Sequence, residues 1–148
     1  MHLWELAARE RIRDTIAHYA HYADTGRFAE LVALFAADGV LEIDGRDPVR
    51  GREAILAFLT STQTSLAATL QRPYIRHHVS SITIEVHGPN DASAASYFLA
   101  ITERGPDHWG RYRDQLARVG ELWLFRHRRV RPDGHGERSW RATRGSTP

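Results

Sequence analysis

Aspartate and histidine residues that could transfer protons stand at two separate points of this 148-residue chain. Asp24 follows Ile16 and Ala20 at steps of four, so it should lie on the inward stripe of an amphipathic helix. It also stands near the end of that helix, where the helix dipole disfavours a negative charge. Burial and the dipole would both make this carboxylate a stronger base. The alternative is an exposed cap or turn residue in the sequence "DTGR".

A pair of adjacent histidines, His77 and His78, opens the strand-like run "RHHVSSITIEVHG". Neighbouring side chains on a strand point to opposite faces, so a regular strand directs only one of them into a given pocket. Alternation places His78 on the same face as Ile84, and the pattern alone therefore points His78 inward. A bulge at Ser80 and Ser81 would reverse this parity. The alternative for either histidine is a structural hydrogen bond.

A third group of polar residues lies in the run "GPDHWGRYRDQLARVG". Tyr112 and Asp114 share one face of this predicted strand, whereas Trp109 and Arg111 take the other. A tyrosine on an inner face can stabilise a phenolate, an enolate or a carboxylate. The alternative is an exposed ladder of charges across neighbouring strands. The histidines of the chain lack the spacing of compact metal-binding motifs, so we expect no metal site.

Composition limits the possible chemistry. The chain has no cysteine, which excludes disulfides, thiolate catalysis and cysteine-type zinc sites. All 20 positive residues are arginines, so lysine Schiff bases and Walker-type phosphate loops are excluded as well. A net charge of only +2 gives no reason to expect a nucleic-acid partner. No apolar run is long enough to span a membrane and the first residues do not resemble a signal peptide, so we expect a cytoplasmic protein.

The elements that must position these residues follow from hydrophobic periodicity. Helical spacing predicts helices over residues 5–23, around 28–35 and over 52–70. A short strand is expected at "VLEI", and four runs rich in β-branched and aromatic residues follow Tyr74. Helices first and strands afterwards indicate an α+β fold with helices on one face of a sheet. We expect a single domain over residues 1–148 with a flexible tail from about residue 133.

The order of the motifs "YADTGRFAELVALFAADGVLEI", "GREAILAFL", "RHHVSSITIEVHG" and "GRYRD" resembles the SnoaL-like branch of the nuclear transport factor 2 (NTF2-like) superfamily. The resemblance covers roughly residues 5 to 132. It extends to scytalone dehydratase, to hexachlorocyclohexane dehydrochlorinase and, more distantly, to ketosteroid isomerase. It implies a cone-shaped fold in which N-terminal helices pack in a strongly curved, mostly antiparallel sheet around one apolar pocket.

The resemblance also implies site residues. In the dehydratase and dehydrochlorinase relatives, an aspartate at the end of the first helix supports a histidine general base, and Asp24 and His77 stand at the matching positions. Tyr112 matches a polar pocket residue, Arg118 falls where the dehydrochlorinase-like pattern has an arginine, and Tyr19 falls where a further polar residue can line the pocket.

Three more residues, His78, Trp109 and Phe58, are expected to contribute to substrate binding. The chain departs from its relatives at Ala23, where they carry a tyrosine, and it lacks the asparagine often found near Ser81.

The function implied by this resemblance is that of a cofactor-independent acid–base enzyme, a lyase or isomerase of the dehydratase, isomerase or polyketide cyclase type. Its substrate would be a small apolar, polyketide-like or steroid-like molecule, and the protein would form a homodimer or homotrimer without nucleic-acid or membrane partners. The alternative is a non-catalytic ligand-binding or subunit-type protein of the same fold. A site built from carboxylates such as Asp44 or Asp114 also remains open.

Overall fold

The computed structural model describes residues 1–141 of the chain. Two long helices and one short helix precede most of the strands, as the periodicity predicts. The elements are α1 Leu3–Thr25, α2 Phe28–Val32, β1 Phe35–Ile43, β2 Val49–Arg50, α3 Arg52–Thr69, β3 Arg76–Gly88, β4 Asp91–Thr102, β5 Gly105–Val119 and β6 Leu122–His135. No helix of this described part is both long enough and apolar enough to cross a membrane.

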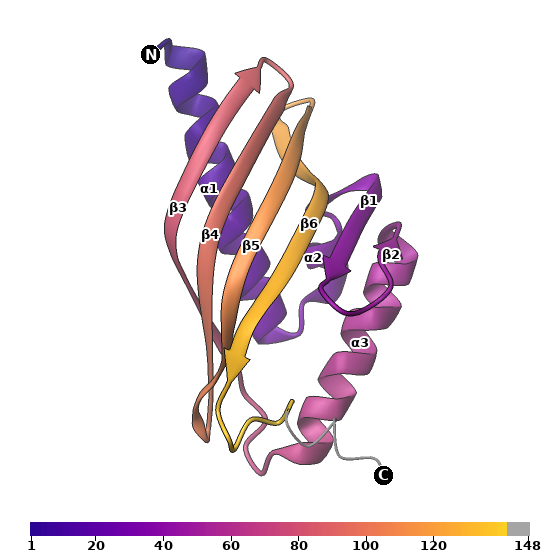
Figure 1. Ribbon diagram of the computed structural model, residues 1–148. Helices are drawn as coiled ribbons and strands as arrows, with labels where there is room; N and C mark the ends of the chain where they lie inside the picture. Colours follow the sequence, from indigo (N-terminus) through magenta and orange to yellow (C-terminus); the bar gives the residue numbers. More distant parts are fainter. Residues whose placement is uncertain (142–148) are drawn as a thin grey trace.

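One curved mixed sheet contains all the strands, in the order β2-β1-β6-β5-β4-β3 (Figure 1). Strands β3 to β6 form an antiparallel meander, because only short turns connect them. Strand β1 pairs in parallel with β6, and helix α3 provides part of the long connection that this topology requires. The predicted α+β fold with a mostly antiparallel sheet is therefore confirmed.

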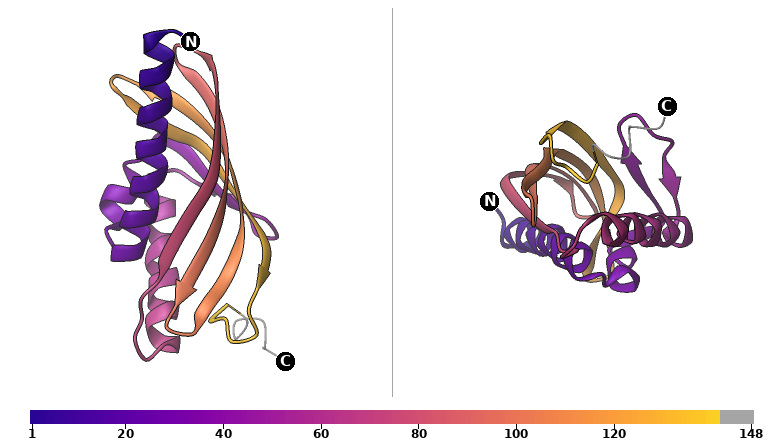
Figure 2. Two further views of the ribbon diagram at one scale, coloured as in Figure 1. Left: turned by 90° about the vertical axis from the view of Figure 1, so that its left-hand side faces the viewer. Right: turned by 90° about the horizontal axis from the view of Figure 1, so that it is seen from below.

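The helices cover one face of the sheet, which curves around them (Figure 2). Helix α1 buries Ile12 and Ile16 completely, as the stripe at steps of four predicts. Leu116 of β5 and Phe125 of β6 belong to the same buried core. The core therefore lies between the helices and the concave face, and the opposite face of the sheet meets solvent.

The C-terminal region differs from the expected flexible tail. Strand β6 continues to His135, and Trp140 is buried against Leu66 and Leu70 of the α3 region and against Ile75. An apolar indole covered by these side chains fixes the segment after β6. Residues 142–148 of the expected tail lie outside the described residues.

Candidate active site

A cavity of about 340 Å³ lies between helices α1 and α3 and the strands of the sheet. Its volume falls within the range of small-molecule binding sites. Side chains from α1, α3, several strands and the C-terminal segment line it, and most of them are apolar. They include Phe58, Leu59, Leu66, Phe98, Val130 and Trp140. The cavity can therefore hold the apolar body of a small molecule.

Asp24 and His77 meet in the wall of this cavity. The Asp24 Oδ1 atom lies 2.6 Å from His77 Nδ1, and its Oδ2 atom accepts a 3.0 Å hydrogen bond from the His77 backbone N–H. One carboxylate thus fixes both the backbone and the ring of the histidine. In the tautomer that donates Nδ1–H to Asp24, Nε2 carries no proton and can accept one.

The end of helix α1 brings Asp24 to this position. Gly26 ends the helix in a left-handed conformation with φ of 71°, and the backbone N–H of Arg27 donates to the Tyr22 carbonyl. Asp24 therefore lies in the last turn of α1, two residues before the glycine that ends the helix. Its carboxylate faces strand β3, where the His77 backbone N–H lies.

A bulge in β3 decides which histidine faces inward. The register with β4 shifts between Ser80 and Thr83, and Ser81 has a positive φ of 51°. Before the bulge His77 faces the cavity, and after it Ile84 faces the core, although strict alternation would place them on opposite faces. His78 is exposed. The prediction from simple alternation that His78 faces inward is therefore wrong. The bulge at Ser80 and Ser81, which would reverse that prediction, is present in the structure.

A second aspartate–histidine pair, of which His108 lines the cavity, was not identified from the sequence. His108 Nδ1 lies 2.7 Å from Asp107 Oδ2. The same carboxylate accepts hydrogen bonds from Ser139 Oγ at 2.7 Å and from the Trp140 backbone N–H at 3.0 Å. The only sequence signal was the adjacent "DH", which alternation would have placed on opposite faces.

The two histidines differ in their surroundings. Burial, and to a lesser extent the charges of Arg141 and His77, lowers the pKa of His108 to about 4 even though Asp107 opposes the shift. His108 is therefore neutral near pH 7, with Nε2 as a hydrogen-bond acceptor. Its ring centroid lies 6.3 Å from that of His77. The cavity thus presents two imidazole rings, His77 from β3 and His108 from β5, with β4 between these strands.

Two tyrosines add hydrogen-bond donors to the lining. Tyr19 and Tyr112 flank the buried Arg128, whose guanidinium carbon lies 4.1 Å and 3.8 Å from their ring centroids. Burial raises the pKa of both phenols even though the charge of Arg128 opposes it. They remain protonated at neutral pH, so each can donate to an oxygen in the cavity.

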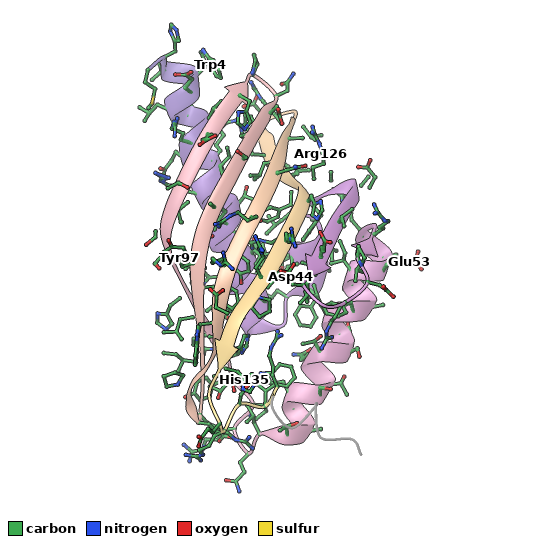
Figure 3. All side chains as sticks on the ribbon, in the orientation of Figure 1. Trp4, Asp44, Glu53, Tyr97, Arg126 and His135 are labelled. Atoms are coloured by element: carbon green, nitrogen blue, oxygen red, sulfur yellow. The ribbon has the colours of Figure 1, made fainter. Side chains whose placement is uncertain are left out.

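The carboxylates of the alternative site are engaged elsewhere. Asp114 forms an ion pair with Arg128 at 3.0 Å, and both side chains are inaccessible to solvent. Asp44 lies beside β6 (Figure 3) and accepts hydrogen bonds from Arg129 at 2.7 Å and Arg131 at 3.2 Å. The bond from Arg129 in particular keeps the pKa of Asp44 below its usual value. Neither carboxylate lines the cavity that contains His77.

The other expected substrate-binding residues divide into two groups. Phe58 lines the cavity together with Tyr19 and Tyr112. His78, Trp109 and Arg118 do not, which corrects the expectation that they do. His78 and Trp109 are exposed because they lie on the outward-facing positions of β3 and β5. Arg118 lies at the β5–β6 turn, where it donates to the Gly120 carbonyl at 2.9 Å.

No metal-binding group was found among residues 1–141, where no three histidine, cysteine, aspartate or glutamate side chains converge. The chemistry that the cavity's side chains offer is proton transfer and hydrogen bonding. Asp24, His77 and His108 supply acceptors, whereas the two tyrosines supply donors.

Known proteins share both the sequence pattern and the fold of this chain. The family model described as a SnoaL-like domain matches residues 4–129. A provisionally assigned scytalone dehydratase from Novosphingobium aromaticivorans is 25% identical with a TM-score of 0.79, over 90% of this chain and 89% of that chain. An NTF2-like protein with a cystatin-like fold from the same species is 27% identical with a TM-score of 0.75, over 95% of this chain and 96% of that chain.

A third structure, from Catenulispora acidiphila, contains the compound S-DNPA. It is 27% identical with a TM-score of 0.71, over 86% of this chain and 95% of that chain. No curated protein matches the chain. The family match and the shared fold confirm the resemblance drawn from the order of the sequence motifs.

Proposed function

The chain belongs to the SnoaL-like domain family, and from this premise we propose that it is a cofactor-independent acid–base enzyme that removes a proton from carbon. The substrate would be a small, largely apolar molecule of polyketide-like or steroid-like shape. The observation that carries the proposal is the contact of Asp24 with His77 inside an apolar cavity. The provisionally assigned dehydratase among the relatives supports a reaction of the lyase class.

In the proposed mechanism, His77 Nε2 takes the proton from the substrate carbon. Asp24 holds the tautomer before the transfer and stabilises the imidazolium after it. The electron pair of the broken C–H bond moves toward an adjacent carbonyl oxygen or expels a leaving group. The imidazolium then returns the proton to the departing oxygen or to another carbon, which completes an elimination or an isomerisation.

Three further side chains would act on the oxygen atoms of the substrate. Tyr19 and Tyr112 would donate hydrogen bonds to the oxygen on which negative charge develops. His108, neutral and buried, would accept a hydrogen bond from a substrate hydroxyl and so orient it. Because these phenols resist ionisation, they serve as donors over the whole physiological pH range.

The test uses Asp24→Asn and His77→Gln with a panel of cyclic β-hydroxy ketones, whose dehydration yields an absorbing conjugated ketone. Both variants should lose about 10²–10⁴-fold in kcat/KM, the usual contribution of a positioned base. His78→Gln is the matched control, because it changes the neighbouring histidine on the outer face. Exchange of the α-proton with deuterated water detects proton abstraction even where no product accumulates.

If folded Asp24→Asn and His77→Gln proteins turn over substrate as fast as the wild type, the proposed role of Asp24 and His77 as a catalytic pair is refuted. Binding of the ketones without turnover or α-proton exchange would favour the alternative, a non-catalytic ligand-binding protein. Circular dichroism of each variant separates these outcomes from simple unfolding.

A further inference from the structure

Two arginines line the cavity and have no role in the mechanism above. Arg46 stands in the loop between β1 and β2, and Arg141 follows β6 in the C-terminal segment. The cavity is otherwise largely apolar, and Asp24 is the one acidic side chain of residues 1–141 that lines it. That carboxylate is already bonded to His77. The other side chains of this lining that carry a permanent charge are Arg46 and Arg141.

Local structure turns Arg46 toward the cavity. The Arg46 backbone N–H donates to the Ile43 carbonyl at 3.0 Å, and Gly45 before it has a φ of 84°. With this tight turn, Arg46 lines the cavity together with Leu41 and Ile43 of β1. Arg46 is exposed, so it lies where the cavity meets solvent.

The guanidinium of Arg46 is available to a ligand. Its side chain forms no hydrogen bond or ion pair with any other residue of the described chain. Of the two aspartates in this loop, Asp44 is occupied by Arg129 and Arg131 of β6, and Asp47 forms no ion pair with Arg46 within residues 1–141. A planar guanidinium with five donors suits a carboxylate, which can accept two of them in parallel.

Arg141 brings a second positive charge to the same cavity from the C-terminal segment. Burial has the largest effect on the pKa of His108, and the hydrogen bond with Asp107 has the second largest. The positive charge of Arg141 comes third and lowers that pKa. The Arg141 guanidinium carbon lies 5.6 Å from the centroid of the Trp140 ring, which lines the cavity together with His108, whereas Arg46 lies at the opening. A negative group inside the cavity would feel both charges in a partly desolvated site.

We propose that the substrate carries a carboxylate, which Arg46 and Arg141 bind while its apolar body fills the cavity beside His77. This inference rests on the proposed function for the reacting end of the molecule and adds the chemical class of the substrate. It also gives the two arginines a positioning role. An anchored carboxylate would fix which carbon of the substrate lies against His77 Nε2.

The test compares acids with their uncharged amides: 2-naphthoate with 2-naphthamide, biphenyl-4-carboxylate with its amide, and cyclohexanecarboxylate with its amide. Each pair shares one apolar body, so the ratio of the two dissociation constants measures recognition of the charge. Isothermal titration calorimetry at pH 7.5 and 50 mM NaCl gives both constants. We expect the wild-type protein to bind at least one acid about fivefold or more tightly than its amide.

Variants assign that preference to the arginines. Arg46→Gln should remove part of it and Arg46→Gln/Arg141→Gln nearly all of it, while affinity for the amide changes little. Arg50→Gln is the matched control, because Arg50 is an exposed arginine of β2 that does not line the cavity. The wild-type preference should also shrink at 500 mM NaCl, since salt screens exposed charges.

Equal affinity for acid and amide in all three pairs overturns the proposal, as does the absence of carboxylate binding in all three. A preference that survives unchanged in folded Arg46→Gln protein and in the double variant also overturns it. His77→Gln separates this inference from the proposed function. If that variant keeps both turnover and the acid preference, the catalytic proposal fails and the carboxylate site stands.

Discussion

His108 should make the protein lose stability in mildly acidic solution. Its pKa is about 4 in the folded protein and 6.5 when the ring is free in water, because burial favours the neutral ring. Below pH 6.5 the unfolded chain therefore binds a proton that the folded chain refuses, and the free energy of unfolding falls as the pH falls. The full difference approaches about 3 kcal/mol near pH 4, and about 2 kcal/mol of it is lost between pH 7.5 and pH 5.

The variant His108→Gln removes this titration and keeps an amide N–H that can donate to Asp107. Urea unfolding at pH 7.5, 6, 5.5 and 5 gives the free energy of unfolding of each protein. Asp107, Arg141 and His77 are the charged or titratable groups that act most strongly on the ring, and all are unchanged in the variant. Their own contributions therefore cancel to first order in the difference between the two proteins.

The wild-type protein should lose about 2 kcal/mol more than His108→Gln between pH 7.5 and pH 5. His87→Gln, which changes an exposed histidine, should lose as much as the wild type. Equal losses in the wild type and His108→Gln would show that His108 binds its proton equally well in the folded and unfolded states. The buried, neutral ring would then be refuted, and with it the acceptor role assigned to His108.

Further predictions concern the bulge, the buried ion pair and the outer face. Ser81→Gly should leave the urea midpoint unchanged or raise it, whereas Ser81→Val should lower stability by about 1–3 kcal/mol, because a β-branched residue resists a positive φ; equal midpoints would contradict the bulge geometry. Arg128→Met should cost about 3–5 kcal/mol by leaving Asp114 buried without its partner, and Asp114→Leu added to it should recover most of that loss, as urea unfolding can measure. Light scattering should give the mass of a dimer or trimer, since Tyr97 and Trp109 are 53% and 37% exposed on the outer face of the sheet; a monomeric mass would contradict this.

The fold could be predicted because its signals are long and local. Ile12 and Ile16 mark one face of a helix over many turns, and the strand runs after Tyr74 are separated by short turns. Such patterns survive small errors at element boundaries. The cone-shaped topology and its pocket were implied by the resemblance of the motif order to the SnoaL-like family, which the family match confirms.

The inward histidine could not be derived from alternation alone. Ser80 and Ser81 are both exposed and small, so serine at these positions fits either face and gives no hydrophobic signal of a bulge. The positive φ of Ser81 is a property of the backbone in the assembled sheet. The family resemblance pointed to His77 rather than His78, and in the structure it is His77 that contacts Asp24.

The second pair escaped prediction for a different reason. Asp107 is buried by Ser139 and Trp140, which lie more than thirty residues further along the chain in a segment expected to be flexible. Without that cover, an aspartate at the start of a strand predicts an exposed turn residue. The burial of His108 follows from this long-range contact, and no local pattern encodes it.

The Asp24–His77 and Asp107–His108 pairs differ in how accessible their histidines are to a substrate. The His77 side chain is 15% exposed and is held from one side by the end of α1, which leaves its other nitrogen toward the cavity. The His108 side chain is only 4% exposed and is held by a carboxylate that three donors already share. A base must change its protonation state during each turnover, and the more accessible histidine with a dedicated carboxylate does so at lower cost. We therefore propose His77 as the base and His108 as the residue that orients the substrate.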